Sequence, residues 1–222
     1  MRTLLLTITL FALSLYGSCN NPWVTPADTS AGALDVKVSV IDLPGSSDGK
    51  NVVVMQFFSG GKPVKFAGGE TVTCNGVSLS LNELLFGYAE RVPIVPVGGT
   101  YHFVYTRSGT PTSLDLTVPA RVVFTSPTAG ATVTRNSNFT INYVADGGSG
   151  INASGSGPAG NLNRNVFQPD NGTYTGLDTT SFGAGAGELS LERRFEGAIS
   201  GTAFHSASRQ YDSWSSINVT WN

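Results

Sequence analysis

The sequence predicts an all-β fold of two consecutive β-sandwich domains, and three observations lead to it. Apolar and polar residues alternate with a period of two over many short segments, as in half-buried strands. Clusters of Gly, Asn and Asp, the usual turn residues, separate these segments. Charged residues are only 13% of the 222 residues, and Ser, Thr, Asn and Gly supply the polarity instead, which suits strands and turns.

The first predicted sandwich domain spans residues 33–119. Asn75-Gly76 is a strong signal for a two-residue hairpin, and one helical turn is expected over 82–88. Short strands at this spacing are typical of an immunoglobulin-like sandwich. They are expected at 34–40, 51–58, 70–74, 77–81, 100–106 and 113–118.

The second predicted sandwich domain spans residues 120–222 and begins after a seam at Pro119-Ala120. A Gly/Ser/Asn-rich segment, 146–163, is expected to be a long loop that is either mobile or functional. No segment has the pattern of a helix of three turns. Strands are expected at 121–127, 130–133, 138–145, 188–195, 198–206 and 216–222.

The N-terminus predicts an exported chain with a signal peptide over residues 1–18. Arg2 precedes an uncharged, mostly apolar stretch, Leu4 to Tyr16, which is followed by the small residues Gly17 and Ser18. This stretch is shorter than the roughly 20 residues that a membrane-spanning helix needs. An N-terminal core helix is the alternative. The polar residues that follow, with two prolines, predict a tether that ends at residue 32.

The residues Leu15-Tyr16-Gly17-Ser18-Cys19 resemble the lipobox of bacterial lipoproteins. The resemblance implies that Cys19 is lipidated and becomes the first residue of the mature chain, so that 19–32 is a lipidated tether. Tyr16 departs from the pattern, because the family prefers Leu at that place. Asn20 after the cysteine implies, by the same resemblance, the outer membrane if the host has one. The alternative is ordinary cleavage and secretion, which would leave a Cys19–Cys74 disulfide open.

A second resemblance covers about half of the mature chain. The run FTSPTAGATVTRNSNFTINY, residues 124–143, is similar to the opening strands of immunoglobulin-like modules in bacterial surface lipoproteins. Residues 60–119 resemble the small β domain that often precedes such a module. These resemblances imply a fold and a location, and no activity.

The sequence contains no motif that indicates catalysis, a cofactor or a metal. The net charge is −2 and there is no basic run, which excludes a nucleic-acid partner. His102 and His205 fall in different predicted domains, and no nucleophile-elbow motif occurs. A carboxylate stripe, Glu188, Glu192 and Glu196 with neighbouring arginines, predicts a solubilising strand surface rather than a catalytic site.

Aromatic residues of the second predicted domain give two alternatives, a sandwich core or a stacking surface for a ligand. On the second alternative, Tyr174 and Trp214 are the candidate ligand-binding residues. The leading hypothesis is a non-enzymatic cell-envelope lipoprotein that binds or scaffolds an envelope protein or glycan. A carbohydrate-binding surface protein is the alternative, and an enzyme built from scattered Asp and Glu is the third. The aromatic set comprises Tyr143, Phe167, Tyr174, Phe182, Tyr211 and Trp214.

Overall fold

A computed structural model describes residues 22–42, 48–163 and 166–222, so the predicted signal peptide and Cys19 lie outside the described residues. The predicted all-β class is confirmed: the described residues form strands and two short 3-10 turns, η1 (Ala31–Ala33) and η2 (Thr180–Phe182). The strands are β1 (Asp35–Ile41), β2 (Lys50–Ser59), β3 (Lys62–Pro63), β4 (Glu70–Cys74), β5 (Val77–Ser78), β6 (Ser80–Asn82), β7 (Gly87–Pro93), β8 (Thr100–Arg107), β9 (Thr110–Thr117), β10 (Phe124–Ser126), β11 (Thr132–Val133), β12 (Phe139–Tyr143), β13 (Gly150–Gly157), β14 (Gly160–Asn163), β15 (Thr173–Leu177), β16 (Gly185–Ala198) and β17 (Ser206–Trp221).

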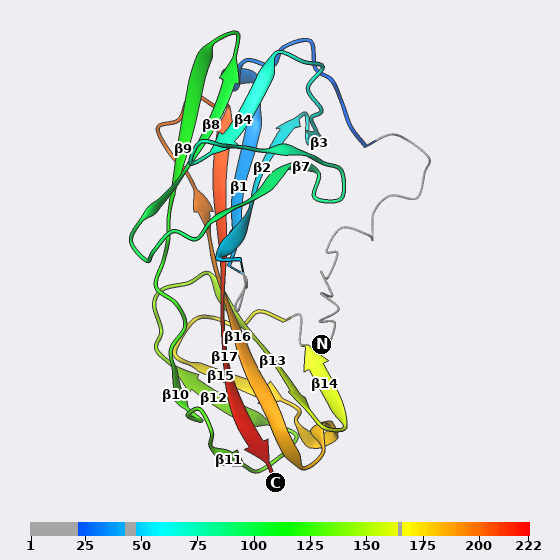
Figure 1. Cartoon of the computed structure of the whole chain (residues 1–222), viewed down its shortest axis with the longest axis vertical. Coiled ribbons are helices and arrows are strands. Elements are labelled where there is room, and N and C mark those ends of the chain that lie inside the picture. Colours follow the sequence, from blue (N-terminus) through cyan, green and yellow to red (C-terminus); the bar gives the residue numbers. More distant parts are fainter. Residues whose placement is uncertain (1–21, 43–47, 164–165) are drawn as a thin grey trace.

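One large sheet runs the whole length of the elongated molecule (Figure 1). Its strand order is β14-β13-β16-β17-β1-β2-β7-β6, and β11 and β3 pair with β17 and β2 beside this path. Two smaller sheets, β5-β4-β8-β9 and β10-β12-β15, complete the fold. The two longest strands, β16 and β17, form an antiparallel hairpin that belongs to both halves of the large sheet.

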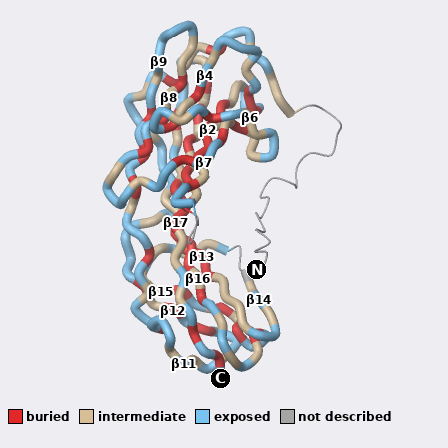
Figure 2. Tube along the Cα trace, in the orientation of Figure 1, coloured by how far each residue is buried: buried red, intermediate tan, exposed pale blue. Residues whose placement is uncertain are grey.

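Each smaller sheet packs against one half of the large sheet, and the two packings enclose separate hydrophobic cores. Figure 2 shows the buried residues following the strands in both halves. The first core contains alternate residues of β1 and β2 together with residues of β4, β8 and β9, among them Val38, Met55, Cys74, Phe103 and Leu116. The second contains residues of β12, β13, β15, β16 and β17, among them Ile141, Ala153, Tyr174, Leu191 and Trp221.

Strand β17 contributes to both cores. Its first half pairs in parallel with β1, from Asp35 opposite Ser206 to Ile41 opposite Asp212, and Tyr211 lies in the first core. Its second half places Trp221 in the second core. The predicted division into domains at residues 119 and 120 stays a prediction. In the structure, the C-terminal hairpin β16–β17 contributes residues to the cores on both sides of that division.

Three local predictions from the sequence were wrong. The expected loop over 146–163 contains β13 and β14, because Gly155 and Gly157 let β13 approach Phe182 more closely than a side chain would permit. The expected strand over 198–206 is the connection between β16 and β17. The expected helical turn over 82–88 is a non-helical turn that leads into β7.

Candidate functional site

The outer face of the large sheet carries a group of polar side chains where the two halves meet. Residues directly opposite each other in a ladder share a face of the sheet. Asn152, Glu192 and Trp214 form one such row across β13, β16 and β17. The adjacent row contains Arg194 and Asp212. With Phe167, which contacts Arg194, these residues are here named the waist face: Asn152, Phe167, Glu192, Arg194, Asp212 and Trp214.

Arg194 is the centre of the waist face. Its Nε lies 2.8 Å from Oδ1 of Asp212, and its Nη2 lies 3.4 Å from Oε1 of Glu192. The guanidinium carbon also lies 4.2 Å from the centroid of the Phe167 ring. An arginine that is paired with carboxylates and stacked on a ring has little freedom to move, so its remaining N–H groups point in defined directions.

Glu192 differs from the prediction that Glu188, Glu192 and Glu196 share a solvent-exposed face. Glu188 and Glu196 are exposed, but the whole Glu192 residue is only 8% exposed. Burial raises the pKa of the Glu192 carboxyl, and the nearby charge of Asp212 raises it further. Glu192 therefore keeps its proton to a higher pH than an exposed glutamate does.

Asn152 adds a buried amide to the waist face. Its Nδ2 donates a hydrogen bond of 3.4 Å to Oε2 of Glu192. Its Oδ1 is buried and accepts no hydrogen bond from the part of the chain that the structure describes. A buried amide oxygen without a donor is costly in a folded protein, and this one is closed to an external ligand because Asn152 is only 2% exposed.

The two candidate ligand-binding aromatics have different surroundings. Trp214 is partly exposed on the waist face, and its role in binding stays a prediction. Tyr174 is 0% exposed and lies in the second core, which corrects its placement on a ligand-stacking surface, because neither face of its ring is open. Tyr143, Phe182 and Tyr211 are buried as well, so the core alternative is correct for these residues. Phe167 is the other partly exposed ring.

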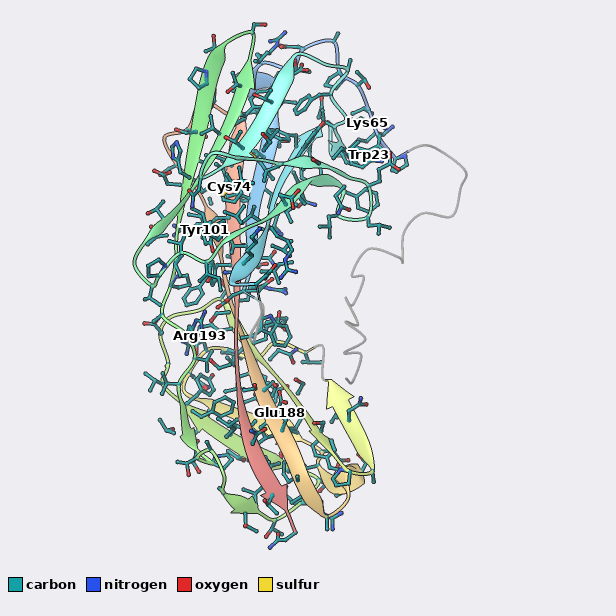
Figure 3. All side chains as sticks on the ribbon, viewed as in Figure 1. Trp23, Lys65, Cys74, Tyr101, Glu188 and Arg193 are labelled. Carbon is teal, nitrogen blue, oxygen red and sulfur yellow. The ribbon has the colours of Figure 1, made fainter. Side chains whose placement is uncertain are left out.

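The opposite face of β16 carries a buried ion pair that includes Arg193, which Figure 3 labels between the two halves of the molecule. Nε of Arg193 lies 2.9 Å from Oδ2 of Asp170, and the two side chains are 1% and 0% exposed. Arg193 also donates a hydrogen bond to the carbonyl oxygen of Val144. Arg193 therefore serves the packing between the cores rather than the charged surface that the sequence predicted for it.

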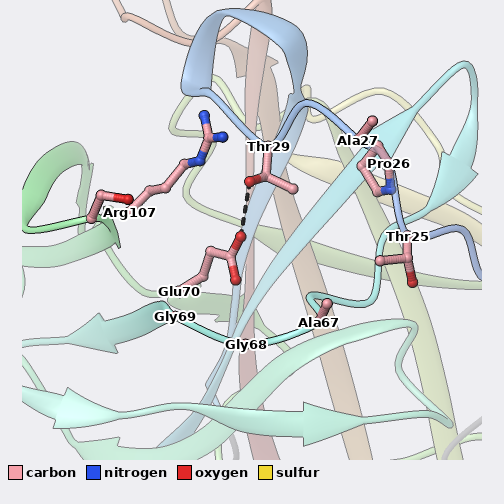
Figure 4. Close-up of a pocket in the computed structure, with 10 residues that line it drawn as sticks. Thr25, Pro26, Ala27, Thr29, Ala67, Gly68, Gly69, Glu70 and Arg107 are labelled. Atoms are coloured by element: carbon pink, nitrogen blue, oxygen red, sulfur yellow. Dashed lines mark hydrogen bonds between the residues drawn. The ribbon is translucent and has the colours of Figure 1, made fainter.

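A shallow cavity of about 320 Å³ lies at the other end of the first core, between the N-terminal segment and the sheet β5-β4-β8-β9 (Figure 4). Oγ1 of Thr29 donates a hydrogen bond of 2.8 Å to Oε1 of Glu70 at this cavity. Arg107 also lines it and lies 3.5 Å from Asp28. Residues 25–29 of the N-terminal segment line one side of the cavity, so the cavity lies where this segment docks on the first core.

The remaining reactive side chains are two exposed histidines and one buried cysteine. His102 and His205 are exposed and pair with Asp115 and Asp35 at 2.6 and 2.8 Å. Burial raises the pKa of the Cys74 thiol to about 12, so the thiolate that reacts is scarce at neutral pH. Within residues 22–42, 48–163 and 166–222, no group of three His, Cys, Asp or Glu side chains is placed to hold a metal ion. Over the same ranges, no helix has the length and apolar character to cross a membrane.

Comparison with known proteins finds distant structural similarities only. No family model matches the chain, and no curated protein matches it. A glucan-utilization-locus protein of Bacteroides ovatus, SGBP-B, solved with a mixed-linkage heptasaccharide, is similar at 12% identity and a TM-score of 0.27. The match covers 86% of this chain and 60% of that chain.

Two further structures are similar at the same level. The fibronectin(III)-like modules of Clostridium thermocellum CbhA match at 14% identity over 88% of this chain and 92% of theirs, with a TM-score of 0.25. Domains 4 and 5 of the S-layer protein SbsC match at 15% identity over 78% and 82%, with a TM-score of 0.22. These similarities assign no function, and the all-β fold of this chain rests on its own strand pairing.

Proposed function

We propose that this chain is a non-enzymatic cell-envelope lipoprotein that acts as a binding module, held at the membrane by a lipid on Cys19. The observation that carries the proposal is the way the N-terminal segment meets the fold. Residues 24 and 64 form a parallel bridge, and Val24 N donates to the Pro63 carbonyl oxygen at 2.9 Å. The Tyr105 hydroxyl donates to the Thr29 carbonyl oxygen at 2.6 Å. An anchor on Cys19 would therefore hold the folded body by a short, docked connection.

The long hairpin β16–β17 supports the same proposal. It joins the two cores in one continuous sheet, so an anchor at the first core would also position the second. Such a body is suited to presenting a binding surface at a fixed place in the envelope. The waist face is the surface that we propose for this role, with an envelope protein or glycan as the partner.

Mass spectrometry of the mature N-terminal peptide from native membranes tests the anchor. A diacyl or triacyl mass on Cys19 is expected, together with release of a Cys19→Ala variant from the membrane fraction. An unmodified N-terminus near Cys19 would contradict the proposal and indicate a secreted protein. The inner or outer membrane is then assigned by separating the two membranes on a density gradient.

Glycan binding at the waist face is a second candidate function, favoured by the partly exposed side chains of Trp214 and Arg194. Sugars present hydroxyl groups to planar amide, carboxyl and guanidinium groups, and their C–H faces stack on aromatic rings. Trp214→Ala is expected to remove binding on a glycan array and in a cell-wall pull-down. Asn218→Ala is the matched control, because Asn218 is exposed on the same face of β17. Absence of glycan binding by the unmodified protein would exclude this candidate.

A further inference from the structure

The segment around Trp23 is held next to an apolar projection of the first core. Trp23 is four residues after Cys19 in the sequence. Four residues of fully extended chain span at most about 14 Å. The neighbouring Val24 is held by two backbone hydrogen bonds of 2.9 Å, one to Pro63 and one from Lys65. An acyl chain on Cys19 would therefore enter a bilayer close to Trp23.

The projection beside Trp23 is the turn between β6 and β7. Leu84, in this turn, is 74% exposed, more than any other large apolar residue of the described chain. The ring centroids of Trp23 and Phe86 are 5.9 Å apart, and both rings are partly exposed. A single exposed leucine is ordinary on a protein surface, but an exposed leucine beside two partly exposed aromatic rings forms a local apolar surface.

This turn is held in one conformation. The side-chain Oδ1 of Asn82 accepts hydrogen bonds of 3.1 Å from the backbone N–H groups of Leu84 and Leu85. Gln56 on β2 donates a 2.8 Å hydrogen bond to the carbonyl oxygen of Leu85. Phe86 has a φ of 49°, a left-handed conformation that is unfavourable for a bulky residue. In this conformation of the turn Leu84 is exposed and the Phe86 ring lies beside Trp23.

Two lysines, Lys62 and Lys65, lie in the segment whose Val64 bridges Val24, and the charge of Lys65 is balanced by Glu83. Lys65, on the same flank as Trp23 in Figure 3, pairs with Glu83 at 3.1 Å while its side chain stays 49% exposed. Lys62, three residues earlier, is exposed. Tryptophan and lysine are the side chains that settle at the boundary between acyl chains and headgroups, the ring at the boundary and the amine toward the phosphates.

We propose that Trp23, Leu84 and Phe86 form a membrane-contact tip that enters the phospholipid surface beside the acyl chains of Cys19. This inference rests on the proposed lipid anchor. Because several acyl chains already give stable anchoring, the tip would set the orientation of the body on the membrane and not its retention there. The edge of the first core that is formed by β6 and β7 would then face the bilayer.

The test uses the lipidated protein, purified from membranes and reconstituted in vesicles of phosphatidylethanolamine and phosphatidylglycerol. A Leu84→Cys variant is labelled with a polarity-sensitive fluorophore, and the buried Cys74 is not expected to react. Val123→Cys is the control, since Val123 is 56% exposed and lies outside the tip. We expect a blue-shifted emission and strong quenching by a lipid-attached quencher at position 84, and neither at position 123.

The outcomes separate the tip from the anchor. The mass of Cys19 is measured on the same sample. If Cys19 carries acyl chains and the two labels give equal emission, the tip is overturned while the anchor stands. If Cys19 carries none, both fail. A second label at the adjacent exposed Glu83 guards against an effect peculiar to position 84, and the same contrast with position 123 is expected there.

Discussion

Arg193 on β16 and Asp170, in the segment that precedes β15, form an ion pair with both side chains shielded from solvent, between the two hydrophobic cores. The guanidinium carbon of Arg193 lies 5.7 Å from the Tyr143 ring centroid in the second core. The same carbon lies 6.0 Å from the ring centroid of Phe195, which packs against the first core. Asp170 also accepts a 2.7 Å hydrogen bond from Gly148 N. One charge pair thus connects residues of both cores and the segment that leads into β13.

Removing one charge of this pair should destabilise the whole protein. Asp170→Asn keeps the shape of the side chain but leaves Arg193 buried without its counter-ion. Breaking a buried pair in this way costs roughly 3–5 kcal/mol. Urea unfolding measures the loss. Glu83→Gln is the control, because the exposed Lys65–Glu83 pair should contribute no more than about 1 kcal/mol. Equal losses in the two variants would show that the buried pair is not structurally important.

The first core should not fold without the C-terminal hairpin. A fragment of residues 22–119 would lack Phe204, Ala207 and Tyr211, which belong to that core. It would also leave one edge of β1 unpaired, and exposed strand edges favour aggregation. We expect the fragment to show no cooperative unfolding transition by circular dichroism, whereas the chain from 22 to 222 does. A soluble fragment with a cooperative transition would instead support an independent domain ending at 119.

The raised pKa of Glu192 predicts a pH dependence of stability. Because folding raises this pKa, folding favours the protonated carboxyl. Its contribution to stability is therefore fully present below the unfolded-state pKa of about 4.3 and is lost as the pH rises through the folded-state value. Glu192→Gln imitates the protonated form, so it should raise the free energy of unfolding at pH 7 relative to the unmodified protein. Above the unfolded-state pKa, it should also make the free energy of unfolding depend less on pH. Urea unfolding between pH 4 and 8 measures it.

The control for this experiment is Glu188→Gln, on the same face of the same strand but exposed. It should leave the slope of stability against pH unchanged. A Glu192→Gln variant that is less stable than the unmodified protein at every pH would contradict the argument, since it would show that the ionised carboxylate stabilises the fold through Arg194.

The sequence predicted the fold class because alternation with a period of two is a local property. The pairing of β17 with β1 is not local, since it joins residues that are far apart in the chain. The same limit explains the waist face. Glu192 was expected at the surface because its position in β16 does not reveal that Asn152 and Trp214, on the two flanking strands, lie directly opposite it.

A signal for the buried arginine was nevertheless present. Leu189, Leu191 and Phe195 alternate along β16, and Arg193 falls on the same face as these apolar residues. A charged residue at an apolar position of a strand predicts a buried, paired charge. Its partner, Asp170, could not be found this way, because it lies outside any strand.

The closest backbone approach in the second core predicts a position where even one methyl group is not tolerated. A Cβ at Gly187 would lie 2.0 Å from Nε1 of Trp221 and 2.3 Å from the carbonyl oxygen of Ser156. These two atoms are joined by a 2.8 Å hydrogen bond that fixes the buried Trp221 ring. Gly187→Ala should therefore force the ring or the β13 backbone to move, at a cost of about 1–3 kcal/mol in the free energy of unfolding.

Gly197→Ala, in the same strand, is the control, because a Cβ there meets nothing nearer than Arg209 at 3.9 Å. If urea unfolding shows the two alanine variants to be equally stable, the close packing of β16, β13 and Trp221 is incorrect. A loss confined to Gly187→Ala supports it, and with it the place of the last strand in the second core.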